Sequence, residues 1–374
     1  MKKFSVLLVG TLLAMSPVPE VAARTLKAAH YLSPRHPVGL GYQTFADELK
    51  RNTNGDLTVR IFAGESLLGA KAISDGVRDG VADIGFDTLT YTPAYYPHGM
   101  LMNDLAMVGE NDMAAAFAIT ELFALECPAC LTEFERQNQV YVSGVSTGPY
   151  VLIGKGDMNS PEALRGKALR AGGPLWDRFA RFAGATGVNI PTSEMYEGLS
   201  RGILNGAIYA VGGLKSHGLA DVATQVVMLP LGSFRSGNLY SFNRDVWSSL
   251  TPEQRKAVFQ AASAALVRTV NAYHAVDDEG VALGKEKGIE ILEPSPGLQK
   301  LRREFVEQDL LEVVANAKKS LGIADAAKFV ADFQRLYAKY LPLVEPIQDD
   351  PAKLADLLYN QVYAKLDPAT YGVK

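Results

Sequence analysis

The sequence predicts an α/β protein of two lobes, joined by hinge strands and crossed by one long helix. Strand-like and helix-like segments alternate from Leu26 to Phe86, and a similar alternation runs from Val140 to Leu204. From Thr251 a helical pattern continues for about 35 residues, which corresponds to more than about 50 Å and exceeds one small domain. The chain of 374 residues is long enough for two domains.

The first alternation indicates a mostly parallel sheet. In chain order we expect a strand at 26–30, a helix at 39–51, a strand at 57–62, a helix at 69–80 and a strand at 82–86. Within the second strand, Leu57, Val59 and Ile61 share one side, as the period of two in a strand requires. Strands that alternate with helices form parallel sheets, and such sheets bind ligands at the carboxyl ends of their strands.

The second alternation has the same form. We expect strands at 140–145 and 150–153, a short helix at 160–164, a strand at 167–170, a helix at 176–183, a strand at 188–190 and a helix at 193–204. Ser160 and Pro161 give the short helix a cap and a first-turn proline. Two units of similar size predict two lobes that face each other across a cleft, a common place for a small-molecule site.

The long helix begins at a capping box formed by Thr251 and Gln254, with Pro252 in its first turn. Apolar residues recur every three or four positions from Val258 to Tyr273. The helix is therefore expected to lie across both lobes.

The chain after Pro296 is largely helical in pattern. We divide the protein into three folded parts on the basis of these patterns. They are lobe I (24–147 plus about 234–270), lobe II (148–233 plus about 271–330) and a C-terminal helical extension (331–374).

The N-terminus has the pattern of a secretory signal peptide, residues 1–23. Lys2 and Lys3 precede the apolar run Phe4–Met15, and small residues stand before the expected cleavage after Ala23. The apolar run is shorter than the roughly 20 residues that cross a bilayer. We therefore expect an exported, periplasmic protein without a permanent anchor.

Composition excludes several classes of partner. The formal charge is −4, from 37 basic and 41 acidic residues, so no basic face for a nucleic acid is expected. The sequence has no phosphate loop, no zinc-protease helix and no dinucleotide-binding glycine motif. We expect no cofactor and no metal site, because two cysteines and five scattered histidines make a poor zinc site.

Two motifs raise the alternative of an exported thiol or serine enzyme. Cys127 and Cys130 have the C-x-x-C spacing of redox enzymes, but a helical pattern beginning at Asn111 precedes them where such enzymes need a strand. We expect a local structural disulfide. Ser146 lies in a G-x-S-x-G sequence, yet Pro149 and a strand-like segment follow where a hydrolase needs a helix.

Arg170 is the most informative candidate for a binding residue. It ends a predicted strand beside the glycine-rich turn at 172–174. A planar guanidinium at such a strand end can bind a carboxylate through two parallel hydrogen bonds.

Motifs in a fixed order carry a resemblance to a known family. Gly166–Arg170 reads GKALR, and Ser193–Gly206 reads SEMYEGLSRGILNG. Earlier matching segments are Ala29-His30, His36-Pro37, Phe45-Ala46, Leu68-Gly69 and Val77–Asp83. Over about residues 25–290 the chain resembles the solute-binding proteins of TRAP (tripartite ATP-independent periplasmic) transporters, the DctP-like family.

The resemblance implies a periplasmic-binding-protein-like fold that closes on an organic acid and delivers it to a TRAP membrane permease, without catalysis. The ligand carboxylate is expected to pair with Arg170. Such a pair is strong when lobe closure excludes water. Neutral analogues are expected to bind poorly, because Arg170 would stay buried and unpaired.

Departures from the family pattern indicate the ligand class. Tyr209 stands where an Asn often faces the ligand, and no second arginine occurs around 148–150. These departures disfavour dicarboxylate and sialic-acid-like ligands. Trp176, Tyr31 and Tyr91 predict a monocarboxylate with an apolar or aromatic part, unless these three aromatics are core residues.

Other predicted ligand contacts come from position alone. Asn238 lies in the segment that returns to the first lobe, Asp87 and Thr88 end the third strand, and Thr192 opens the second motif. A binding protein that serves a sensor instead of a permease is the nearest alternative function. The protein is expected to be a monomer or a homodimer, with the C-terminal helices as a possible interface for a dimer.

Overall fold

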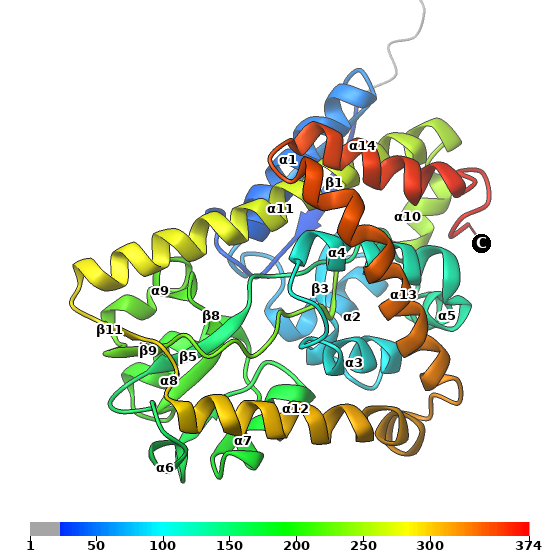
Figure 1. Ribbon diagram of the computed structural model, residues 1–374. Helices are drawn as coiled ribbons and strands as arrows, with labels where there is room; N and C mark the ends of the chain where they lie inside the picture. Colours follow the sequence, from blue (N-terminus) through cyan, green and yellow to red (C-terminus); the bar gives the residue numbers. More distant parts are fainter. Residues whose placement is uncertain (1–22, 374) are drawn as a thin grey trace, which may run out of the picture.

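The computed structural model describes residues 23–373 and has two lobes, each built on one β-sheet (Figure 1). The predicted signal peptide therefore lies outside the described residues, apart from Ala23. The predicted α/β class with two lobes is confirmed.

The first lobe contains a five-stranded sheet in the order β2-β1-β3-β10-β4. Its strands are β1 (Arg24–Ala29), β2 (Leu57–Phe62), β3 (Ile84–Thr88), β4 (Gln139–Val140) and β10 (Gly237–Asn243). β1 is parallel to both β2 and β3, as the strand–helix alternation predicts. β10 returns from the second lobe and pairs antiparallel with β3 and β4.

The second lobe contains a six-stranded sheet in the order β11-β9-β5-β8-β6-β7. Its strands are β5 (Tyr150–Gly154), β6 (Ala168–Arg170), β7 (Thr186–Val188), β8 (Gly206–Ala210), β9 (Gln225–Val227) and β11 (Glu290–Leu292). β6 is parallel to β7 and β8, whereas β5 is antiparallel to β8 and β9.

Helices cover both sheets. Those before the long helix are α1 (Pro37–Asn52), α2 (Ile73–Arg78), α3 (Pro97–Asp104), α4 (Asp112–Glu121), α5 (Pro128–Arg136), α6 (Pro161–Leu164), α7 (Pro174–Phe182), α8 (Met195–Ser200), α9 (Gly213–Ser216) and α10 (Arg244–Ser249). Two short 3₁₀ turns matter for the cleft, η2 (Leu89–Tyr91) and η4 (Thr192–Glu194).

The predicted long helix is α11 (Pro252–Glu286), and it runs obliquely from one lobe to the other in the upper left of Figure 1. Both hydrogen bonds of the capping box between Thr251 and Gln254 are present. α11 packs on α1 in the first lobe and on α9 in the second. Gly280 allows this second contact, because a Cβ there would lie 2.6 Å from the carbonyl oxygen of Val211.

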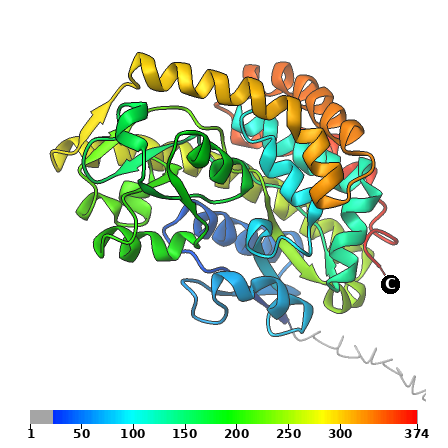
Figure 2. The ribbon, with the colours of Figure 1, turned by 90° about the horizontal axis from the view of Figure 1, so that it is seen from below.

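The remaining helices continue from the second lobe back to the first. They are α12 (Pro296–Asn316), α13 (Ala326–Val344) and α14 (Pro351–Gln361). Leu298 and Phe305 of α12 belong to the core of the second lobe, and Val313 belongs to the core of the first. Figure 2 shows α12 as a second long connection between the lobes, and α13 and α14 then pack on the first lobe.

Two extended segments also join the lobes, residues 141–149 between β4 and β5 and residues 228–236 between β9 and β10. The strand predicted at 140–145 ends at Val140, so this prediction was wrong for 141–145. Those residues leave the first sheet to cross to the second, and they pair with neither sheet as a strand.

Within residues 23–373, no single helix has both the length and the apolar character that crossing a bilayer requires. One bent pair, Asp112–Glu126 with Pro128–Arg136, meets that test only when its two helices are taken together across an 82° bend.

Candidate ligand-binding site

A small cavity lies between the lobes, at the carboxyl ends of β3 and β6. Its lining comes from both lobes and from the two crossing segments. The lining residues are Tyr31, Leu32, His36, Phe86, Thr88, Tyr91, Thr147, Tyr150, Arg170, Thr192, Tyr209, Phe234 and Tyr273. The cavity volume is about 20 Å³, which is room for about one water molecule.

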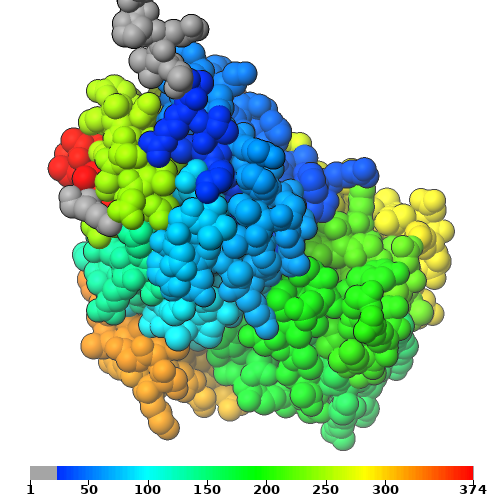
Figure 3. Space-filling model, turned by 180° about the vertical axis from the view of Figure 1, so that it is seen from behind, coloured from blue at the N-terminus to red at the C-terminus, as the bar shows by residue number. Residues whose placement is uncertain are grey.

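The lobes are closed over this cavity. Thr90 Oγ1 of the first lobe donates to the carbonyl oxygen of Gly172 at 3.0 Å, and Ser193 Oγ of the second donates to Glu65 Oε1 at 3.0 Å. Figure 3 shows the surfaces of the two lobes, blue to cyan and green, in contact. A ligand larger than water therefore needs the lobes to separate before it can enter.

Arg170 is a buried cation at the end of β6, with 1% of its surface exposed. Its Nε donates to the carbonyl oxygen of Ile190 at 3.1 Å, and its Nη2 donates to the hydroxyl of Tyr91 at 3.3 Å. Its guanidinium carbon lies 5.7 Å from the centre of the Tyr209 ring. Among the described residues no carboxylate forms an ion pair with Arg170, and its Nη1 has no hydrogen-bond partner. A buried cation without a counter-ion favours an anionic ligand.

Two further polar atoms in the cavity wall are buried and have no partner within residues 23–373. They are His36 Nε2 and Thr192 Oγ1. His36 Nδ1 accepts a hydrogen bond from the backbone N–H of Val38 at 3.2 Å, so the proton of the neutral ring must be on Nε2. Burial lowers the pKa of His36 well below its ordinary value, which keeps the ring neutral. The cavity therefore presents a neutral N–H donor as well as the cationic N–H of Arg170.

Most of the remaining lining is aromatic. The rings of Tyr150 and Tyr209 lie 5.1 Å apart in the second lobe, and those of Tyr31 and Phe86 stack at 5.8 Å in the first. Burial raises the pKa of Tyr209 well above its ordinary value, so its hydroxyl remains protonated. These flat apolar walls favour a ligand with an apolar or aromatic part.

Six of the predicted site residues line the cavity and three do not. Arg170, Tyr209, Tyr31, Thr88, Tyr91 and Thr192 are in the lining. Tyr91 lies between the lobes, because its hydroxyl accepts both from Arg170 and, at 3.1 Å, from the backbone N–H of Thr192.

The structure does not bring Asp87, Asn238 or Trp176 to the cavity. Side chains alternate along β3, so Asp87 points away from the face that carries Phe86 and Thr88, and it accepts from the hydroxyl of Tyr96. Asn238 Oδ1 accepts backbone hydrogen bonds within the first lobe. Trp176 lies behind Tyr150, with ring centres 4.5 Å apart, and donates to the carbonyl oxygen of Leu231.

Six aromatic or polar lining residues were not predicted from the sequence as ligand contacts. They are His36, Phe86, Thr147, Tyr150, Phe234 and Tyr273. The segments that join two lobes form the back of the cleft. Phe234 lies in one of these segments and Tyr150 directly follows the other, so both could have been predicted as lining residues. Tyr273 lies in the middle of α11, where its helical spacing predicts only a core position.

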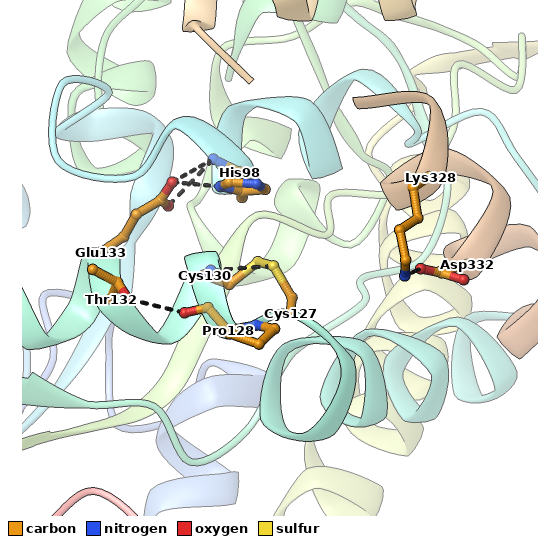
Figure 4. Close-up of a disulfide and its surroundings, with 8 residues drawn as sticks. All are labelled: His98, Cys127, Pro128, Cys130, Thr132, Glu133, Lys328 and Asp332. Carbon is orange, nitrogen blue, oxygen red and sulfur yellow. Dashed lines mark hydrogen bonds and ion pairs between the residues drawn. A yellow bond between two sulfur atoms is a disulfide. The ribbon is translucent and has the colours of Figure 1, made fainter. Parts of the chain in front are cut away.

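Neither enzyme motif forms an active site. Ser146 is buried, and its Oγ donates to Asp112 Oδ1 at 3.1 Å. His274 bonds to the other oxygen of Asp112, so among the described residues the carboxylate lies between the serine and this histidine, and no histidine bonds to the serine itself. Cys127 and Cys130 form a disulfide at the start of α5 (Figure 4). The predicted helix before the cysteines is present, as α4 and the π-helical turn η3 (Leu122–Glu126).

Comparison with known proteins decides the family. The sequence profile described as bacterial extracellular solute-binding protein, family 7 (DctP), matches residues 28–316, which is most of the chain. This chain belongs to that family. Proteins of this family bind and transport ligands, so the chain is a ligand-binding protein and not an enzyme.

Individual relatives are distant from this DctP-family protein. A curated solute-binding protein of Albidiferax ferrireducens is 24% identical over 193 residues, which is 51% of this chain and 56% of the relative. The match thus spans little more than half of that relative.

Solved structures of TRAP solute-binding proteins share the fold. One, from an unidentified marine microbe, is described as specific for aromatic acid ligands and was solved with 3-hydroxybenzoate. It is 20% identical, has a TM-score of 0.75, and covers 85% of this chain and 99% of its own. Another, from Rhodoferax ferrireducens with copurified benzoate, is 18% identical, has a TM-score of 0.74, and covers 86% of this chain and 100% of its own.

A buried carboxyl group lies at the crossing of the two lobes of this solute-binding protein. Asp277 of α11 accepts from the backbone N–H of Gly212 at 2.7 Å, and its Oδ2 also lies against Gly148. Burial raises the pKa of Asp277 to about 7, and the titratable groups that act on it are His274, Asp112 and Asp278.

We expect Asp277→Asn to stabilise the protein at neutral and alkaline pH only. The folded-state pKa of Asp277 is above its unfolded value, so the folded protein binds the extra proton. The contribution of Asp277 to the free energy of unfolding therefore falls as pH rises from about 4 to about 7 and changes little above that. Asparagine retains an acceptor for Gly212 and removes this loss. Chemical unfolding of both proteins at about pH 4, 6 and 8 tests this, and an equal difference at all three would contradict it.

Proposed function

We propose that this protein is the extracytoplasmic substrate-binding subunit of a TRAP transporter, works in the periplasm, and captures a monocarboxylate with an aromatic or apolar part for delivery to a membrane permease. One observation carries the ligand class. Arg170 is buried in the cavity between the lobes with no counter-ion among the described residues and with Nη1 unbonded.

A ligand carboxylate would complete the bonding of Arg170. Nε and Nη2 are already used by Ile190 and Tyr91, so the carboxylate approaches Nη1 and shares Nη2. Hydrogen bonds between two charged groups are roughly twice as strong as neutral ones, and they are stronger still where water is excluded. Closing of the two lobes around the ligand would supply that exclusion, and Thr90 and Ser193 already make contacts between the lobes.

The rest of the lining supports the rest of the assignment. Aromatic rings from both lobes favour a flat apolar body, and His36 Nε2 and Thr192 Oγ1 offer hydrogen bonds to a second polar group on it. A single cationic group in the lining disfavours a dicarboxylate, because a second carboxylate would be buried without a partner. Aromatic acids such as the benzoate and 3-hydroxybenzoate bound by the two solved relatives are of this class.

Native mass spectrometry of the protein purified from the periplasm tests the proposal. The expected result is one small carboxylic acid per chain, identified after denaturation and absent from Arg170→Ala. A protein isolated empty is next screened by thermal shift against benzoate, hydroxybenzoates, aliphatic monocarboxylates and dicarboxylates. Equal retention of a ligand by Arg170→Ala, or a response to neutral amides equal to that of the acids, would contradict the proposal.

Replacing Thr192 with valine is expected to distinguish the contribution of the ligand's second polar group to the affinity from that of its carboxylate. The shape is conserved and the hydroxyl is lost, while the backbone N–H of Thr192 still donates to Tyr91. If the hydroxyl binds the second polar group, the affinity for 3-hydroxybenzoate falls by about fivefold, because a hydrogen bond contributes about 1 kcal/mol. The affinity for benzoate, which has no such group, is expected to stay unchanged. Isothermal titration with both acids checks this, and equal losses for the two would contradict it.

A further inference from the structure

The Cys127–Cys130 disulfide lies beside the buried pair of His98 and Glu133, and none of these four residues lines the cavity between the lobes. Cys127 caps α5, and its Sγ accepts the backbone N–H of Cys130 at 3.1 Å. His98, from α3, lies over the two sulfurs, and Glu133 lies one turn after Cys130 on α5 (Figure 4). Side-chain ligand atoms of His98 and both cysteines all lie within 4.8 Å of one another, and all three residues are buried.

Glu133 fixes the orientation of the His98 ring. Its carboxylate accepts the backbone N–H of His98 at 3.2 Å and contacts His98 Nδ1 at 2.5 Å. An ionised carboxylate only accepts hydrogen bonds, so Nδ1 carries the proton and the lone pair of the neutral ring is on Nε2. A carboxylate that holds the far nitrogen of a histidine is the usual support of a metal-bound histidine.

We propose that the reduced pair Cys127 and Cys130, together with His98 Nε2, forms a binding site for a thiophilic divalent cation, with Zn²⁺ as the favoured ion and Glu133 as a positioning residue. A C-x-x-C pair with one histidine is a common zinc ligand set, and a fourth position is left for water. Zinc bonds of about 2.0–2.3 Å place tetrahedral ligands about 3.5–4 Å apart. Rotation of the cysteine side chains after the S–S bond opens brings the three ligand atoms to this spacing.

The charges support a site for a divalent ion. Two thiolates and one neutral imidazole neutralise Zn²⁺, so the occupied site adds no net charge to the protein interior. In residues 23–373 this is the only group of three or more His, Cys, Asp or Glu side chains that meets the geometric requirement for a metal. Pro128 and Ala129, between the cysteines, are exposed residues, and Cys127 keeps 7% of its surface exposed.

Two local features would stabilise a thiolate formed by reduction of this disulfide. A thiolate of Cys127 would keep the hydrogen bond from Cys130 and lie at the N-terminus of α5, and both effects stabilise the reduced form. In the reaction, a dithiol reductant transfers two electrons and two protons. The S–S bond between Cys127 and Cys130 breaks, two thiols form, and the reductant closes its own disulfide. Binding of Zn²⁺ then releases the two thiol protons.

Metal binding by the full mature protein before and after reduction tests the proposal. The protein is reduced with a phosphine, desalted without oxygen, and titrated with Co²⁺ and Zn²⁺. We expect a thiolate-to-Co²⁺ charge-transfer absorption in the reduced protein only, bleached by one equivalent of Zn²⁺, and no such band in the oxidised protein. Absence of the band in reduced protein, or equal retention of Zn²⁺ in both forms, would overturn the proposal.

Variants assign the ligands. Cys127→Ser with Cys130→Ser, and separately His98→Ala, are expected to lose the stoichiometric binding, and Glu133→Gln to weaken it by about 10- to 100-fold. The matched control is Asp332→Asn, which removes a neighbouring carboxylate that pairs with Lys328 and is expected to change nothing. If the double serine variant does not fold, reduced wild-type protein alkylated at both thiols replaces it. Full binding by the alkylated protein or by His98→Ala would refute this ligand set.

Discussion

Replacing Arg170 with glutamine is expected to abolish tight binding of the organic acid. The side chain is 1% exposed and has no counter-ion among residues 23–373, so a bound carboxylate is the group that would balance its charge. Removing one partner of a buried charge pair costs about 2–5 kcal/mol, which is about 30-fold to several-thousand-fold in affinity. Glutamine keeps part of the aliphatic side chain and one hydrogen-bond donor group, so the loss of affinity comes mainly from the lost positive charge.

Isothermal titration with benzoate, or with the acid identified by mass spectrometry, measures this loss. Arg165→Gln is the matched control, because Arg165 belongs to the same segment but is exposed, and we expect no change in its affinity. Arg170→Lys is expected to be intermediate, since an ammonium keeps the charge without the two parallel donors. Thermal unfolding of the unliganded variants shows whether each is folded. Unchanged affinity in a folded Arg170→Gln protein would place the carboxylate elsewhere.

Sequence patterns predicted the elements that depend on local signals. α11 begins at the predicted cap, and β2 has the predicted bounds. Both predictions depend only on residues that are close together in the sequence, namely the capping residues of the helix and the alternation of apolar and polar residues in the strand. Arg170 was placed at a strand end beside a glycine-rich turn, and the family motifs on either side of that turn made it the candidate partner of a carboxylate.

Which side chains face the cleft depends on how the two lobes meet, and local sequence patterns could not predict it. Asp87 and Thr88 are neighbours in β3, and only the direction of the cleft decides that Thr88 lines it and Asp87 does not. Trp176 has the character of a ligand-contacting aromatic, yet Tyr150 lies between it and the cavity. Pro128 is a signal for the start of a new helix, and α5 does begin there. Only the helix that precedes the cysteines was predicted from the sequence, and α5 was not.

The C-terminal helices, predicted as a helical extension, pack into the first lobe. Side chains of α14 and of the turn after it belong to the core of the first lobe. Tyr363 donates to the carbonyl oxygen of Val142, and Tyr371 donates to that of Tyr141, at 2.9 and 2.8 Å. These bonds fix the segment that leads from β4 to the second lobe, so the C-terminal helices support the hinge region of the binding protein.

We therefore expect Leu358→Ala in α14 to destabilise the first lobe. Leu358 has no exposed surface and packs in the same core as residues of α11. Truncating a buried leucine removes apolar contacts and leaves a cavity, which costs about 2–5 kcal/mol of unfolding free energy. Chemical unfolding measures the change, and a lower midpoint with an unchanged slope is the expected result.

Leu311→Ala is the control for this substitution. Leu311 of α12 is 84% exposed, so the same truncation there is expected to change the unfolding free energy by less than about 0.5 kcal/mol. Light scattering of both variants separates a core from an interface. If α14 mainly contacts a second copy of the chain, Leu358→Ala lowers the mass at a given concentration and leaves the unfolding of the monomer unchanged. A core position gives the opposite result, because the side chain then stabilises each chain by itself whether or not it dimerises.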